Sequence, residues 1–170
     1  MEKMSLAVFG ETGHVLGALT GKGELSNVAS DLVGESLQIR EPVTGEILLS
    51  VEASRLKVEL VDRQDQALLA ARKYALVDGV PEEQGNISSL TLTGSQIQLT
   101  LPDDTTQDLE AWVQVEGGGT SVRIVRKIEI PRGHPKATPV TEALSLDSGD
   151  FGVLAMVPGY HAWTGRVTVP

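Results

Sequence analysis

The composition of this 170-residue chain is that of a soluble globular protein, with 41% hydrophobic and 22% charged residues. Its formal net charge of -9 argues against a nucleic-acid partner. The absence of cysteine excludes disulfides, thiolate metal sites and cysteine nucleophiles. A chain of this length can bury one large core or two small ones. Because aromatic residues make up only 4%, the core must consist of Val, Leu, Ile and Ala.

The opening residues, MEKMSLAVFGETG, contain an apolar stretch that is too short for the core of a signal peptide. No apolar run in the chain approaches the ~20 residues that a helix needs to cross a bilayer. We therefore expect a cytoplasmic protein without a membrane partner, either free or as part of a particle assembled in the cytoplasm.

Two similar β-hairpins are predicted in the first third of the chain, at Ser5–Thr20 and at Gln38–Val51. Each has short apolar runs on both sides of a Thr-Gly turn, with Gly13 in the first hairpin and Gly45 in the second. Glycine supplies the positive φ that tight hairpin turns need. Residues 21–34 are rich in Gly, Ser and Asn and predict a loop.

The segment Leu56–Tyr74 is ambiguous. Its second part, around Leu68–Leu76, would form a helix on propensity alone. A strand that pairs back across a polar turn at Asp62–Gln66 fits the surrounding pattern better, and we predict this strand. The first part alternates apolar and polar residues, with the apolar ones at Leu56, Val58 and Leu60.

A domain boundary is predicted within Asp78–Ser88, which contains Gly, Pro and acidic residues without periodicity. We expect an N-terminal β-hairpin domain at 1–79, a linker at 80–87 and a C-terminal β-sandwich domain at 88–170. The predicted fold class is all-β, with one or two sandwiches of short antiparallel strands.

The C-terminal part begins with a β-meander pattern that occurs twice in succession. In Ser89–Leu101, apolar residues occupy every second position on both sides of a turn at Thr93–Ser95. A second pair of strands follows in Leu109–Ile130, around the three glycines Gly117–Gly119. Alternation of this kind places one face of each strand on a core.

The end of the chain resembles a known family of small sandwiches. Ser148–Phe151 leads into an alternating strand, followed by Pro158–Tyr160 and a closing strand that contains RVTV. This ending is similar to that of prealbumin-like modules of the carboxypeptidase-regulatory-like, PEGA and Cna-B types. For residues 88–170 the resemblance implies a sandwich of about seven strands that presents surfaces and catalyses nothing.

No group of residues in the sequence predicts catalysis or a bound cofactor. There is no serine nucleophile motif, and the adjacent acids Asp103 and Asp104 suit a turn rather than a pair of opposed catalytic carboxylates. His14, His134 and His161 each lie at a turn or a strand end without a ligand at metal spacing. We expect them to be solvated, and we predict no metal and no cofactor.

Two groups of surface residues are candidates for interaction. Trp112 should point away from the apolar face of its strand, where it is exposed or covers either a second core layer or a sheet edge. With Tyr160 and Trp163 it could contact a sugar or a protein. A basic run in the otherwise acidic chain includes Arg123 and Lys127 on the same strand face. These two could be solvated or could contact the acids of a neighbouring subunit.

These observations favour a non-enzymatic structural or interaction module that packs into a larger protein assembly. We expect other protein subunits as partners, including copies of this chain. Phage-like particles and injection machines use small sandwiches in this way, by analogy of fold only. The alternative is a β-sandwich module that binds a carbohydrate or another ligand.

Overall fold

The computed structural model describes residues 3–19, 36–41, 43–62, 72–117 and 122–170. In this part of the chain nearly all regular structure is antiparallel strand, and the one helical element is the single 3-10 turn η1 (Ala53–Arg55). The all-β prediction is confirmed. None of these residues belong to a helix that is long and apolar enough to cross a bilayer.

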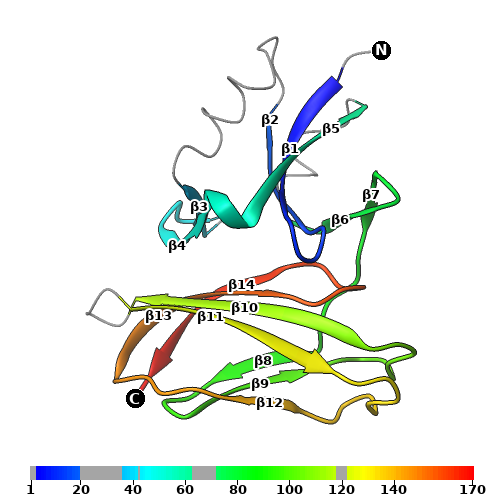
Figure 1. The fold of residues 1–170 in the computed structure, drawn as a ribbon. Coiled ribbons are helices and arrows are strands. Elements are labelled where there is room, and N and C mark those ends of the chain that lie inside the picture. The colour runs from blue at the N-terminus through cyan, green and yellow to red at the C-terminus, as the bar shows by residue number, and fades with distance from the viewer. Residues whose placement is uncertain (1–2, 20–35, 42, 63–71, 118–121) are drawn as a thin grey trace.

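The C-terminal half forms two sheets that face each other (Figure 1). Both predicted meander hairpins are confirmed. The first sheet has the order β12-β9-β8, with β8 (Ser89–Leu92), β9 (Gln96–Thr100) and β12 (Val140–Ala143). The second has the order β11-β10-β13-β14, with β10 (Leu109–Gly117), β11 (Val122–Ile130), β13 (Gly149–Met156) and β14 (Trp163–Val169).

The main core lies between these two sheets. Alternate residues of each strand point inward, so that Ile97 and Leu99 of one sheet meet Val113, Phe151 and Val153 of the other, all of them buried. Full burial of one such side chain contributes about 1.5–3 kcal/mol. The alternation that predicted the strands therefore also predicted the core face.

The N-terminal half contains both of the predicted hairpins, and they are confirmed. The turn glycines Gly13 and Gly45 have φ values of 78° and 72°. The strands are β1 (Lys3–Phe9) and β2 (Val15–Leu19), then β3 (Ser36–Arg40) and β4 (Ile47–Glu52). In a three-stranded sheet, β1 lies between β2 and β5 (Leu56–Asp62). The predicted loop at 21–34 lies outside the described residues.

A strand is confirmed at Tyr74–Val77, the described end of the ambiguous segment, but its predicted pairing with the preceding strand was wrong. Strand β5 pairs with β1, whereas β6 (Tyr74–Val77) pairs with β7 (Val80–Glu83). The reason is the turn: Asp78 and Gly79 have φ values of 51° and 78°, and two positive values in succession define a two-residue hairpin turn. Strand β7 thus occupies half of the expected linker, and residues 63–71 lie outside the described part.

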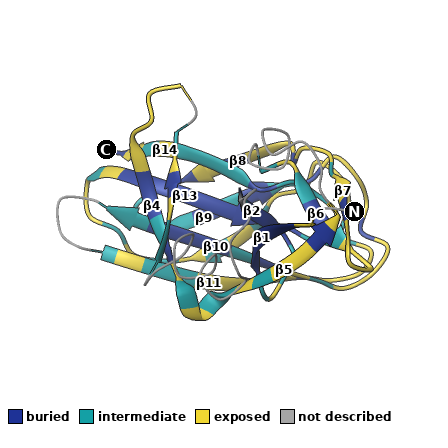
Figure 2. Cartoon of the chain, turned by 90° about the horizontal axis from the view of Figure 1, so that it is seen from above, coloured by how far each residue is buried: buried dark blue, intermediate teal, exposed yellow. Residues whose placement is uncertain are grey.

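A second buried cluster joins the two halves. Leu154 and Met156, on the outer face of the β10-β13 sheet, pack with Phe9, Leu49 and Val51 of the N-terminal half. The sheet is therefore covered on both faces. Seen from above in Figure 2, buried residues occupy the middle of the molecule, and exposed residues gather in the loops at its rim. The boundary at residues 80–87 remains a prediction.

Candidate functional site

The candidate site is the outer face of the four-stranded sheet, where β4 crosses β13. The crossing depends on Gly152, because a Cβ built there would lie 2.5 Å from the carbonyl carbon of Leu48 and closer still to its oxygen. Carbon atoms in contact are normally about 3.5–4.0 Å apart. A residue without a side chain is needed at this point for the backbone of β4 to approach.

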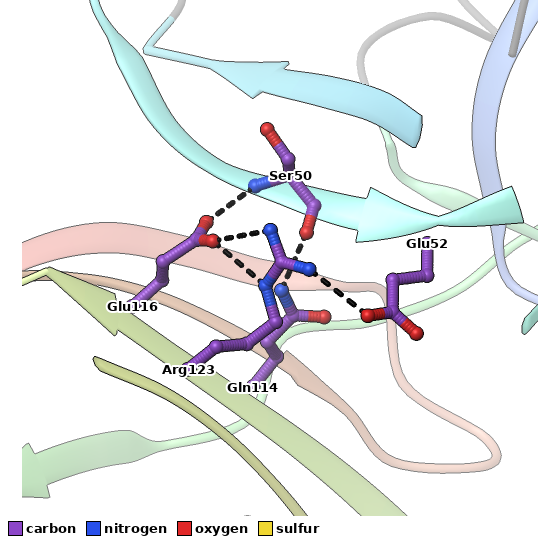
Figure 3. Close-up of polar contacts among 5 residues, drawn as sticks. All are labelled: Ser50, Glu52, Gln114, Glu116 and Arg123. Carbon is purple, nitrogen blue, oxygen red and sulfur yellow. Dashed lines mark hydrogen bonds and ion pairs between the residues drawn. The ribbon is translucent and has the colours of Figure 1, made fainter. Parts of the chain in front are cut away.

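Beside this crossing, side chains of β10 bind the backbone of β4 (Figure 3). The N–H of Ser50 donates to Oε2 of Glu116 at 2.6 Å, and the side-chain amide of Gln114 donates to the carbonyl of Ser50 at 2.7 Å. We call these three residues the Ser50 clamp. Gln114 is only 2% exposed, so its amide would be costly to bury without this acceptor. Among the described strands β4 pairs only with β3, and the clamp supplies hydrogen-bond partners for the backbone of Ser50.

Arg123 of β11 connects the clamp to the end of β4. Its guanidinium lies 2.7 Å from Oε1 of Glu116 and 3.0 Å from Oε1 of Glu52. The hydrogen bond to Glu116 is the main cause that raises the pKa of Arg123, so the guanidinium remains charged. Both ion pairs are partly exposed and contribute at most about 1 kcal/mol each. Arg123, a candidate docking residue in the sequence, is thus occupied within the chain.

Trp112 lies on the same outer face and covers the second core layer, as one of the predicted alternatives had it. Its ring packs against Phe9, with centroids 6.0 Å apart, and the guanidinium of Arg55 lies 5.4 Å above it. Both neighbours come from the N-terminal half. Among the described residues, the buried indole N–H has no hydrogen-bond acceptor.

The remaining predicted residues do not form one surface. Lys127 is the cross-strand partner of Trp112 and lies 3.6 Å from Glu129. Tyr160 and Trp163 instead pack against the main core. The hydroxyl of Tyr160 donates to Asp103 at 3.1 Å, and partial burial together with this bond raises the pKa of Tyr160 to about 12. The outer face therefore holds Trp112, Arg123 and Lys127 but neither of the two other aromatic residues.

Shallow grooves lie on both sides of η1, and no pattern in the sequence predicted them. One, of about 340 Å³, lies between η1 and β11. The other, of about 460 Å³, lies between η1 and the first hairpin and includes Glu11 and Lys57. Arg55 contributes to both grooves. Nothing in the local sequence around Arg55 predicts this position, because β11 is distant in the chain.

The chain matches no family model, no curated protein and no solved structure. The prealbumin-like resemblance of residues 88–170 stays a prediction. What this face can bind must be inferred from its own residues.

His14 is a residue whose role the sequence did not predict. We expected a solvated turn histidine, but the side chain is 0% exposed. Nδ1 lies 2.7 Å from Oγ1 of Thr12, and Nε2 lies 2.6 Å from the carbonyl of Tyr160 in the C-terminal half. Burial lowers the pKa of His14, and the nearby His161 lowers it further. A neutral ring can accept from Thr12 and donate to Tyr160.

The described histidines do not lie in a group of side chains that could hold a metal ion. Across the residues that the structure describes, no three His, Cys, Asp or Glu side chains are grouped as they would be around a metal ion. His134 is separate from His14: its Nε2 lies 2.7 Å from the carbonyl of Thr138. His14 is best understood as a buried polar link between the halves.

Proposed function

We propose that this protein is a non-enzymatic structural subunit that packs into a larger protein assembly, including contacts between its own copies. The observation that carries the proposal is the β6–β7 hairpin. Two valines flank the turn of this hairpin, Val77 and Val80, and their side chains are 41% and 55% exposed. Exposed apolar side chains at the end of an ordered hairpin are well placed to enter a hydrophobic contact on another subunit.

The hairpin can present these valines at low entropic cost. Asp78 and Gly79 adopt the two positive φ values of a tight turn, and the strands on either side are paired in register. A surface that is already ordered loses less conformational freedom on binding. Two valines alone make only a small contact, so the proposed interface also includes the polar residues around them.

A non-enzymatic role agrees with how the polar side chains are used. His14 binds a backbone carbonyl of the other half. Asp104 and Asp108 accept the backbone N–H groups of Lys136 and Arg132, at 2.7 and 2.8 Å. Groups held in this way support loops and junctions.

The carbohydrate-binding alternative has less support than the assembly role. Sugar binding by aromatic residues needs an accessible ring face. The ring of Trp112 contacts Phe9 and Arg55, and Trp163 packs against the main core.

The proposal is tested by measuring the mass of the protein in solution over a range of concentrations, by native mass spectrometry and light scattering. We expect association. The double variant Val77→Ser, Val80→Ser should weaken it about 30-fold, which corresponds to about 1 kcal/mol for each valine.

Val43→Ser is the matched control, because Val43 is 90% exposed at the end of the other hairpin, β3–β4. It should leave the association unchanged. A wild-type protein that stays monomeric at every concentration, or an assembly that the double variant does not weaken, would contradict the proposal.

A further inference from the structure

We infer that the outer edge of β11 is a docking surface for an extended strand of a partner protein, with an acidic residue between two apolar ones. This partner is distinct from the copies of the chain considered above. Strand β11 has nine residues and lies at the end of its sheet. Among the described strands none pairs with its second edge, whose backbone groups can accept an added strand.

A groove reaches this edge. Arg123 and Val125 lie on the outer face of β11, since their cross-strand partners are Glu116 and Gln114. Ile124 and Arg126 lie on the core face. Residues of both faces line the same groove of about 340 Å³, so the groove runs past the backbone between them. Its opposite wall includes Glu52 and Arg55.

Arg126 defines the chemistry of the partner. It is exposed and lies opposite the buried Val113. Among the described residues, its guanidinium makes no ion pair. A charge on the core face of an edge strand prevents pairing with an apolar strand, because the charge would be covered without a partner. An acidic residue opposite Arg126 removes this penalty.

The neighbours of Arg126 on the core face are Ile124 and Ile128, both packed against the main core. A strand added to the edge would place apolar residues beside these two. On the outer face, Arg123 and Lys127 already have acidic neighbours within the chain, so the partner needs no charge there. The expected pattern is apolar, any, acidic, any, apolar.

A second copy of β11 does not fit this pattern. An antiparallel pair of β11 strands that places Ile124 opposite Ile128 of the other copy also places Arg126 opposite Arg126. Like charges directly across a pair of strands destabilise it. Arg126 therefore selects against self-pairing and in favour of an acidic strand.

The test uses three fluorescein-labelled peptides, TVTETVT, TVTQTVT and TVTKTVT, titrated against the intact protein by fluorescence anisotropy. We expect the glutamate peptide to bind about tenfold or more tightly than the other two. Arg126→Glu should reverse the preference, so that the lysine peptide binds best. Lys136→Glu, which makes the same change of charge at an exposed residue outside β11, should leave all three affinities unchanged.

Arg126→Gln is a second variant that introduces no negative charge, and it should remove the preference for glutamate. In hydrogen exchange, the glutamate peptide should slow the amides of residues 122–130. Equal binding of all peptides, no binding, or an unchanged preference in the Arg126 variants would refute the inference. Protection of these amides that rises with protein concentration, without peptide, would show that a second copy occupies the edge and would also refute it.

The two proposals fail separately. A protein that associates with itself but ignores the peptides refutes only the β11 inference. A protein that binds the glutamate peptide but remains monomeric refutes only self-assembly.

Discussion

Substitution of Gly152 by alanine tests the junction between the two halves most directly. The added Cβ would lie 2.5 Å from the carbonyl carbon of Leu48 and 3.0 Å from its Cα. Because carbon atoms in contact need about 3.5–4.0 Å, β4 must move outward by about 1 Å or more. The movement affects the Ser50 clamp, since Ser50 is two residues further along the same strand.

The expected loss follows from these contacts. Overpacking of a closely packed site costs about 1–3 kcal/mol. The two clamp hydrogen bonds, now 2.6 and 2.7 Å long, would lengthen beyond good geometry and lose about 1 kcal/mol each. We predict that Gly152→Ala lowers the free energy of unfolding by about 3–5 kcal/mol, a large share of the 5–15 kcal/mol of a typical domain.

Urea unfolding followed by tryptophan fluorescence provides the measurement, because Trp112 reports on the junction and Trp163 on the sandwich. The control is Gly85→Ala: a Cβ at Gly85 meets nothing within 4 Å, so stability should stay within about 0.5 kcal/mol. If Gly152→Ala were as stable as the wild type, the close crossing of β4 over β13 would be refuted.

Four further experiments probe the same molecule. Because the pKa of His14 is lowered in the folded state, the unfolded chain binds more protons than the folded chain when the pH falls below the ordinary value of 6.5. Thermal melting from about pH 8 to about pH 5 should therefore show that stability falls below that pH, and His14→Gln should reduce the fall. Gln114→Ala leaves a carbonyl of β4 without its donor and should cost about 1–3 kcal/mol in urea unfolding, with no effect expected if the clamp does not form. Trp112→Ala should cost about 2–4 kcal/mol, since the ring is half-buried at the junction; a cost below about 0.5 kcal/mol would mean an exposed ring. Cleavage after Glu82 by a glutamyl endopeptidase tests the predicted domain boundary: the C-terminal fragment should keep strand-type circular dichroism, and a fragment without folded structure would contradict that boundary.

The local parts of the fold were predictable because their causes are local. Alternation and a turn glycine are both contained in a short window, and they correctly predicted the hairpins around Gly13, Gly45 and Gly94. The pairing of β10 with β13 and of β9 with β12 is not contained in such a window. It depends on which edges remain after the hairpins have formed.

The β6–β7 hairpin shows a different kind of error. The Asp-Gly pair at residues 78 and 79 is a strong turn signal, yet the following Pro81 and glutamates suggested a linker. Proline is tolerated in a short peripheral strand, so its presence did not exclude β7.

The candidate site was less predictable because its residues meet across the junction. The face of β11 that carries Arg123 was predicted from alternation, but its partner Glu52 is 71 residues away. The sequence indicates only that Gly152 lies near the start of a strand. The need for a glycine at this position comes from the close approach of β4, which is distant in the chain. His14 bonds to the backbone carbonyl of Tyr160, and no spacing in the sequence connects these two residues.

The shared outer cluster has a consequence for biosynthesis. Phe9, Leu49 and Val51 are synthesised before Leu154 and Met156, which pack with them in the folded protein and follow Phe9 by more than a hundred residues. Contacts between such distant residues close slowly, and apolar surface that waits for its cover is prone to aggregate. Until β13 has been synthesised, the apolar side chains of these strands lack the cover that Leu154 and Met156 provide.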